Sequence, residues 1–529
     1  MKINQLTGLT GLFYCILQIL FMVLFAKEGA DCFRFLFLSL CSAGVFWCFL
    51  SGYTKDYTYR NIRARINRNQ RAQAQTFFRA MLLLECLALL CVSGVLYVFA
   101  TPLSTLLFGS VSYWLLILMS IPVLIFLTVS NLFVGLFLGE GVGAPILITE
   151  AVSILVFVIC VFISQPLFEK SGFSVSMLLR NSDMEVAYAA LGILLSMAVA
   201  TFVRCFIYVI FYNLFGKQFL EDPIDNGSYR NVPLFMSQIV KQIFSEMILH
   251  VNVSLPFILL PVLCVAFGFS ATGGSWMGYL SGLTLPLMMI LFYINKMLCN
   301  GHLNEIAHIR KLDDFKKFKA SLAGLYQGIL ITVLPVCAYV FAAADLICKN
   351  LGYTDDNGAL VLRFGSVQMI LFIFIWVSRK IMRMWKIPKA VALLEIPSVI
   401  AGILFLIVLR IPAFSGLVKT MTAMILIQFL ILLIESLVIH RRVKLHTDLV
   451  DDWIKPALCA FIAAFVIFVM ISAFGNVFAP LIALVATAVF YAGIFVALVL
   501  ALRCIHISTA RYLPGSRFWM KLAEVFHLQ

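Results

Sequence analysis

Fourteen apolar runs, each about as long as a membrane-spanning helix, dominate the sequence. A helix needs roughly 20 apolar residues to cross the hydrocarbon core of a bilayer, which is about 30 Å thick. Within hydrocarbon every backbone polar group must bond inside the protein, so only helices and closed barrels span it. Runs of this length predict helices. The composition agrees, since 63 % of the residues are hydrophobic and 12 % charged, far from the usual mix of soluble domains.

We therefore predict an all-α polytopic membrane protein of about 14 transmembrane helices. The seventh run is long enough that it could also be two pieces. The expected spans are residues 6–26, 33–53, 80–100, 113–138, 145–164, 186–214, 232–267, 276–294, 322–346, 359–378, 388–409, 417–438, 457–474 and 478–502.

The loops between these runs share the basic residues unevenly. Of 39 Lys and Arg residues, 29 fall in one alternate set of loops and termini and 8 in the other, while Arg204 and Lys241 lie within spans. Cytoplasmic loops carry the excess of Lys and Arg in polytopic membrane proteins. The pattern predicts a multi-pass protein of the cell (inner or plasma) membrane with both termini in the cytoplasm.

Three other interpretations of the sequence are unfavourable. The net charge of +14 does not indicate nucleic-acid binding, because its cations sit in short loops where orientation accounts for them. The 14 cysteines include no CxxC pair, so neither a disulfide framework nor a zinc site is expected. Gly139, Gly141 and Gly143 are predicted to form a tight turn, because no βαβ unit surrounds them as a phosphate loop requires.

Short loops argue against an enzyme. A membrane glycan polymerase or transferase would need catalytic groups and a folded region outside the membrane, and the longest outer loop, residues 165–185, has about twenty residues. Its charged cluster of Arg180, Asp183 and Glu185 is explained by a solvated helix start. We expect no catalytic residue. The basic inner loops, residues 54–79 and 295–321, are predicted to form interfacial or coupling helices, or else solvated connecting helices.

The sequence also contains an internal repeat. FFRAMLLLECLALLCVSGVLYVFA and FKASLAGLYQGILITVLPVCAYVFA each follow a basic loop and end in YVFA, at an offset of 240 to 242 residues. The same offset superimposes the second span on the eighth and the fourth on the tenth, and transporters are often built from two related halves. We predict an N-terminal six-helix lobe (1–222), a C-terminal six-helix lobe (223–446), and two further helices with a basic cytoplasmic tail (447–529).

These segments resemble a known family. AKEGADCFRFLFLSL, TYRNIRARINRNQRAQAQTFFRAMLLL, LFVGLFLGEGVGAPILITEAVSILV, RNVPLFMSQIVKQIF and GGSWMGYLSGLTLPLMMILFYINKML are similar to segments of the multidrug, oligosaccharidyl-lipid and polysaccharide (MOP) exporter superfamily. The likeness is greatest to its fourteen-span lipid-linked oligosaccharide and lipid II flippases and their sporulation-associated relatives. It implies two six-helix lobes in a V-shaped arrangement around a central cavity, working by alternating access.

Two cations within spans are candidates for binding a polar substrate. Arg204 and Lys241 lie about ten residues from the cytoplasmic ends of their spans, roughly 15 Å deep at 1.5 Å per residue. Ionisable groups at such depth usually face a cavity or pair with each other, and both could neutralise a diphosphate. Two alternatives remain: Arg204 snorkels or forms a structural pair, and Lys241 lies at the membrane interface.

The seventh span has one polar face, as expected of a helix that lines a cavity or packs against polar neighbours. Its Pro256 and Pro261 would permit bending. The polar face consists of Gln238, Lys241, Gln242, Ser245, Glu246, His250 and Asn252.

Carboxylates are the candidates for ion coupling. The resemblance implies that Glu246 and Glu395 lie on helices that form a cation site in some relatives, and His250 lies on the same polar face as Glu246. Three shallower carboxylates, Glu85, Glu150 and Glu435, are expected to be interfacial anchors or partners of loop cations. No metal site and no cofactor is expected, and transport would be coupled to Na⁺, H⁺ or the membrane potential.

The leading hypothesis is a flippase that moves a polyprenyl-diphosphate-linked oligosaccharide, or another cell-envelope polysaccharide precursor, from the inner to the outer leaflet. Lipid II flippases carry cavity arginines on their first helices. Here the first span has none, and Arg34 lies at the outer end of the second, so other lipid-linked glycans are equally compatible. The alternative is a cation-coupled multidrug antiporter. Expected partners are the bilayer, the lipid-linked glycan and the enzymes of glycan biosynthesis.

Overall fold

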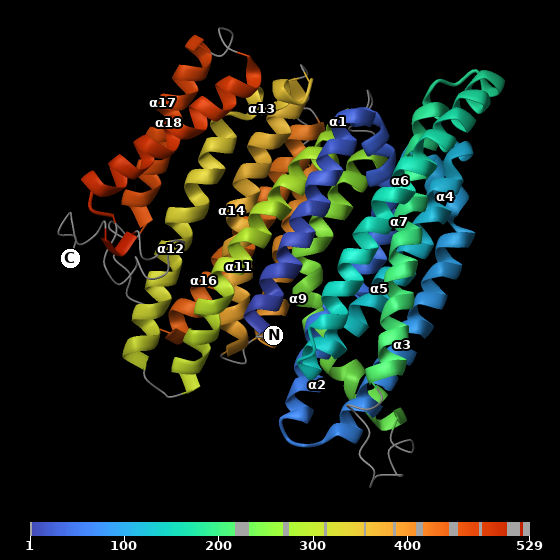
Figure 1. Cartoon of the computed structure of the whole chain (residues 1–529), viewed down its shortest axis with the longest axis horizontal. Helices are drawn as coiled ribbons and strands as arrows, with labels where there is room; N and C mark the ends of the chain where they lie inside the picture. Colours follow the sequence, from blue (N-terminus) through green and yellow to red (C-terminus); the bar gives the residue numbers. More distant parts are fainter. Residues whose placement is uncertain are drawn as a thin grey trace. The chain divides into compact units, whose positions relative to one another are not determined.

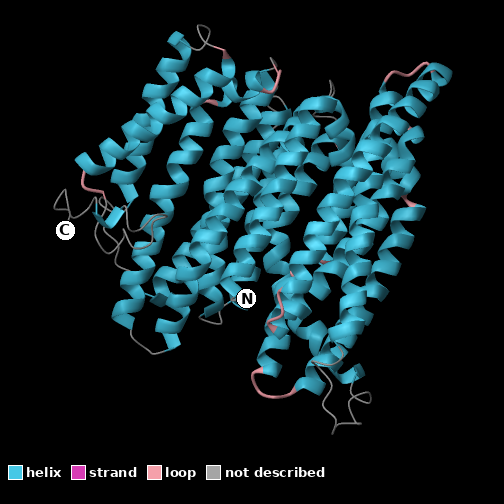
Figure 2. Ribbon diagram, in the orientation of Figure 1, coloured by secondary structure: helices cyan, strands magenta, loops and turns pink. Residues whose placement is uncertain are grey.

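A computed structural model gives the fold of most of the chain, and every regular element in the described part is a helix (Figure 2). The description covers residues 3–216, 232–267, 274–311, 315–353, 356–384, 388–408, 416–443, 453–474, 479–504 and 519–521.

Twelve helices in these ranges are long and apolar enough to cross a membrane. One of them, Leu9–Ile66, covers both the first and the second predicted span, and a shorter apolar helix, Leu393–Ile407, lies in the eleventh. Each of the fourteen predicted spans therefore coincides with an apolar helix. The prediction of an all-α polytopic membrane protein is confirmed.

The chain divides into two compact units. Unit 1 comprises residues 1–17, 27–281 and 388–420, and unit 2 comprises residues 18–26, 282–387 and 421–529. The predicted lobe boundaries, at residues 222 and 446, lie outside the described residues.

Ten α-helices of the described part lie wholly or mainly in unit 1 (Figure 1). They are α1 (Ile3–Leu50), α2 (Thr54–Ile66), α3 (Arg71–Val98), α4 (Ala100–Phe108), α5 (Trp114–Glu140), α6 (Ala144–Leu179), α7 (Asp183–Phe211), α9 (Val232–Ala266), α10 (Ser275–Tyr279) and α15 (Pro388–Val408).

Unit 2 holds the remaining α-helices of the described ranges. In it α12 packs against α11, α14 and α17, and the red helices α17 and α18 lie side by side in Figure 1. The helices are α11 (Leu285–Lys311), α12 (Phe315–Ala342), α13 (Ala344–Asn350), α14 (Asp356–Met384), α16 (Gly416–Val443, which begins in unit 1), α17 (Lys455–Phe474) and α18 (Pro480–Ala501).

A glycine separates the first two spans. Helix α1 runs through both, but Gly29 has φ 84° and ψ 173° and so interrupts the helical backbone. L-amino acids with a side chain rarely adopt a positive φ, whereas glycine does so at little cost. The short connection between the first two predicted spans is therefore a sharp bend at Gly29.

Two glycines let α5 approach α2 closely. A Cβ atom on Gly135 would lie 2.8 Å from the Lys55 carbonyl oxygen, and one on Gly139 would lie 2.7 Å from the Ile62 side chain. Small residues spaced four apart allow this approach between membrane helices, where packing rather than the hydrophobic effect holds helices together. The predicted tight turn follows directly, because Gly141 ends α5 with φ 82° and α6 begins at residue 144.

The two YVFA segments have the same local structure. Helix α3 ends at Val98 and the short α4 follows, while α12 ends at Ala342 and the short α13 follows. The residue at each break, Phe99 or Ala343, has φ near −90° and ψ near 10°. This correspondence supports the internal repeat.

The predicted outer loop at residues 165–185 is wrong. Helix α6 continues to Leu179 and α7 starts at Asp183, so three residues separate the two helices. Hydropathy falls where a helix leaves the bilayer, but the helix itself need not end there. The prediction that the basic segments 54–79 and 295–321 are helical is confirmed, because α2 and the start of α3 occupy the first and α11 and α12 extend over most of the second.

Candidate functional site

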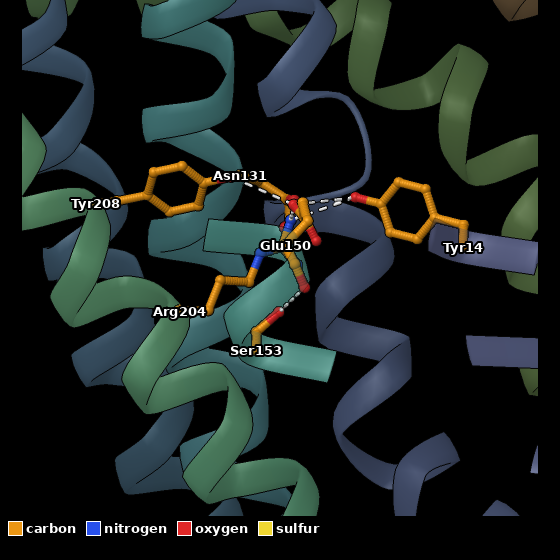
Figure 3. Close-up of polar contacts among 7 residues, drawn as sticks. Tyr14, Asn131, Glu150, Ser153, Arg204 and Tyr208 are labelled. Carbon is orange, nitrogen blue, oxygen red and sulfur yellow. Dashed lines mark hydrogen bonds and ion pairs between the residues drawn. The ribbon is translucent and has the colours of Figure 1, made fainter. Parts of the chain in front are cut away.

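A buried ion pair lies inside unit 1. Arg204 of α7 and Glu150 of α6 are both buried, and the guanidinium Nη2 lies 2.5 Å from the carboxylate Oε1. Two phenol hydroxyls also bond this carboxylate, from Tyr14 of α1 and Tyr208 of α7, each at 3.2 Å (Figure 3). Desolvated charges require such additional hydrogen bonds, because Coulomb attraction alone seldom offsets the loss of hydration.

Helix geometry explains how this network forms. Tyr208 follows Arg204 by one turn on α7, so both side chains lie on one face of that helix. Helices α6 and α7 pack along their length, which brings Glu150 opposite both. Tyr14 comes from the first span and also accepts a long hydrogen bond from Arg204, at 3.4 Å.

A second cation lies near the pair. Lys55, at the start of α2, interacts electrostatically with both Glu150 and Arg204. Two basic residues, Arg204 and Lys55, thus interact with the carboxylate of Glu150, and Asp56 also acts electrostatically on Lys55. Arg204 was predicted either to face a substrate or to form a structural pair; its contacts are those of a structural pair, and its substrate role stays a prediction.

Helix α9 carries most of the remaining predicted site residues. Glu246 accepts a hydrogen bond from Arg60 of α2, with Nη1 and Oε1 3.0 Å apart. His250 packs edge-on against Trp47, with ring centroids 5.8 Å apart. Its ring occupies the space that a Cβ on Gly52 would need. Glu246 and His250 therefore lie against α2 and the end of α1.

Four predicted substrate contacts, Gln238, Lys241, Gln242 and Ser245, lie on α9, but their side chains are outside the described residues. The other ion-coupling candidate, Glu395 of α15, is fully buried and accepts a hydrogen bond from Asn252 Nδ2 at 3.2 Å. Asn252 follows Glu246 by six residues, about 9 Å along the helix. Glu246 and Glu395 thus have different partners at different levels of α9. Among the described residues no group of three or more His, Cys, Asp or Glu side chains could hold a metal.

The three shallow carboxylates differ in their partners. Glu435 of α16 bonds the loop cation Arg379, 2.8 Å from Nε, as predicted. Glu150 pairs with Arg204 inside the membrane region instead of with a loop cation. Glu85 of α3 has no hydrogen-bond partner on either oxygen. Depth along a helix therefore does not determine how a carboxylate is satisfied.

Unit 2 contains an apolar cavity of about 580 Å³. Leu334, Ala338 and Phe341 of α12 form one wall, Val367 and Ile370 of α14 another, and α17 closes it. From α17 come Phe461, Ala464, Phe465 and Phe468. A volume of this size is typical of sites for small organic molecules, and its lining suits a hydrocarbon chain.

The contacts that the sequence did not indicate are those of Tyr14, Tyr208 and Arg60. Tyr208 had a usable signal, since it stands one turn from an intramembrane arginine. Tyr14 and Arg60 had none, because they reach partners 136 and 186 residues away.

Solved structures carry a similar arrangement of helices. The chain is similar to the lipid II flippase MurJ in an inward closed conformation, with a TM-score of 0.63 at 13 % identity over 93 % of this chain and 97 % of that one. It is also similar to the eukaryotic MATE transporter AtDTX14, with a TM-score of 0.56 at 12 % identity over 87 % of this chain and 97 % of that one.

A third similar structure is an inward-facing multidrug resistance MATE family transporter of the MOP superfamily, with a TM-score of 0.50 at 13 % identity over 84 % and 95 % of the two chains. No protein-family model and no curated protein matches the sequence. The chain shares its fold with these three structures, and the resemblance noted in the sequence is confirmed at the level of fold.

Proposed function

We propose that this protein is a flippase that moves a polyprenyl-diphosphate-linked oligosaccharide, or a related cell-envelope polysaccharide precursor, from the inner to the outer leaflet. The likeness of fold to MurJ supports a flippase, and lipid II is what that relative's name says it moves. In this proposal the two lobes, residues 1–222 and 223–446, alternate access to the substrate, and no covalent bond of the substrate changes.

The observation that carries the proposal is the apolar cavity of unit 2. One of its walls is α17, the first of the two helices that follow the twelve expected in two six-helix lobes. The alternative function, a multidrug antiporter, gives these two helices no role. A hydrocarbon tail lying between α12, α14 and α17 would give them one.

Charge supports an anionic head group. In unit 1, the basic residues Lys55 and Arg204 both interact electrostatically with Glu150, in a region of low dielectric, where a basic group attracts an anion strongly. We assign the head group to Arg204, Lys241, Gln238, Gln242 and Ser245, the residues that the sequence predicts. An antiporter for cationic drugs would favour acidic groups instead.

The test is leaflet transfer in proteoliposomes. A polyprenyl-diphosphate-linked sugar is incorporated, and the fraction of head groups accessible to an external sugar-modifying enzyme is followed with time. Ala464→Trp fills the cavity and should slow transfer about tenfold. The matched control is Ile462→Trp on the same helix, because Ile462 is 43 % exposed and does not line the cavity; it should transfer normally.

Equal rates in both variants would remove the cavity from the mechanism. No transfer by the native protein, together with efflux of a cationic dye from the same vesicles, would favour the antiporter, a function that the likeness of fold to two MATE transporters also supports. Elongation or release of the glycan without transfer would indicate an enzyme. Co-purification with glycosyltransferases would identify the expected biosynthetic partners.

A further inference from the structure

Glu85 occupies a position in α3 where an apolar residue belongs. It lies one turn after Met81 and one turn before Leu89, on the same helix face. Met81 and Leu89 are core residues of two hydrophobic clusters of unit 1. Glu85 itself is 1 % exposed. The carboxyl group is therefore set between two apolar clusters in a membrane-spanning helix.

The carboxyl has no hydrogen-bond partner on either oxygen. Four other glutamates in the described part differ, since each bonds a basic or amide group: Glu150, Glu246, Glu395 and Glu435. Glu140 also lacks a hydrogen bond, but it is the last residue of α5 and Arg71 acts on it electrostatically.

Among the residues whose side chains the structure describes, no cation pairs with Glu85. Helix α3 packs against α2, α5 and α9. Tyr53, in the turn before α2, and Cys86 of α3 itself interact electrostatically with Glu85, and neither is a cation. Arg60 of α2 pairs with Glu246 of α9, and α5 carries no charged residue before its last.

An ionised carboxylate in such a place would lose its hydration without gaining a counter-charge, and buried groups of this kind bind a proton instead. We propose that Glu85 is a proton-binding site: its carboxyl is protonated in this conformation and releases the proton when helix movement exposes it to water. Glu85 lies near the cytoplasmic end of its predicted span, so the proton is exchanged with the cytoplasm. Coupling of this proton to leaflet transfer rests on the proposed function, whereas the protonation itself does not.

The protonation is tested on the purified full-length protein in lipid nanodiscs. All variants carry Glu140→Gln, which removes the other buried carboxyl without a hydrogen bond. Infrared difference spectroscopy between neutral and alkaline pH should then show the C=O stretch of a protonated carboxylic acid at neutral pH. The band should be missing from Glu85→Gln and retained in Glu305→Gln, a control at an exposed glutamate of α11. The band should also be missing from Glu85→Leu, a variant that places an apolar side chain between Met81 and Leu89. A band that persists in both Glu85 variants overturns the proposal.

The coupling is tested by transfer across a pH gradient. For one proton per cycle, one pH unit should change the distribution of the lipid-linked sugar between leaflets about tenfold. Glu85→Gln should transfer without responding to the gradient, and Glu85→Asp should restore the response. An unchanged response in Glu85→Gln refutes coupling through this residue. If the native protein transfers nothing, the proposed function fails, and the infrared band still decides the proton site.

Discussion

Removing Arg204 should destabilise unit 1 strongly, because it leaves Glu150 charged and buried. Two unit charges about 4 Å apart attract by about 4 kcal/mol at an effective dielectric constant of 20. The hydroxyls of Tyr14 and Tyr208 still bond the carboxylate, but neutral donors do not replace a cation. Breaking a buried pair from one side costs about 3–5 kcal/mol in other proteins, and we expect Arg204→Met to lose this amount.

The assay is a double-mutant cycle on the free energy of unfolding in mixed micelles. Arg204→Met and Glu150→Leu should each destabilise the protein. The double variant should recover most of the loss, because replacing both charges by apolar groups is often neutral. Single variants as stable as the native protein would refute the reasoning.

The same cycle separates the two roles that the sequence leaves open for Arg204. If the double variant folds and transfers lipid-linked sugar normally, the arginine is structural. If it folds and transfers nothing, the guanidinium also acts on the substrate. Leaflet transfer by the double variant is measured as headgroup accessibility in proteoliposomes.

Three further changes have defined outcomes. Gly139→Ala places a Cβ 2.7 Å from a side chain of α2 and should cost about 1–3 kcal/mol of stability. Gly94→Ala is the control and should be neutral or stabilising, because a Cβ there meets nothing within 4 Å. Thermal unfolding in detergent compares the two variants. Gly29→Ala forces a residue with a side chain to adopt φ 84°, which should cost roughly 1 kcal/mol of stability and lower the thermal unfolding midpoint. An unchanged midpoint would contradict the bend. Arg60→Glu should weaken the contact between α2 and α9, and the swap with Glu246→Arg should restore it, as measured by the thermal unfolding midpoint in detergent.

Hydropathy predicted the membrane helices well because it reports directly on the bilayer, whereas the orientation predicted from the basic loops stays a prediction. A run of residues must be apolar wherever it meets hydrocarbon, so all fourteen spans were recognisable, as was the turn that ends at Gly141. Hydropathy carries no information about a helix beyond the lipid headgroups. It could not show that α6 continues to Leu179, since the helical backbone is equally satisfied in water.

The candidate site was predictable only in part. The predicted depth of Arg204 within its membrane span identified this residue as unusual. Its partner lies 54 residues away on another helix, and no local sequence pattern specifies that pairing. Glu85 and Glu150 looked alike because both are shallow carboxylates in apolar spans. Glu150 is ion-paired and Glu85 is not, because the neighbouring helices place different side chains beside them. Which side chains those are depends on how the helices pack.

The resident guanidinium beside Glu150 has a practical consequence. A guanidinium does not lose its proton under physiological conditions, so the counter-charge of this carboxylate is part of the polypeptide and is never drawn from the solution. The fold of unit 1 around it should therefore be indifferent to whether the buffer contains sodium, potassium or choline. Any dependence of activity on these ions then reports on other groups, and the buffer can be varied freely to find them.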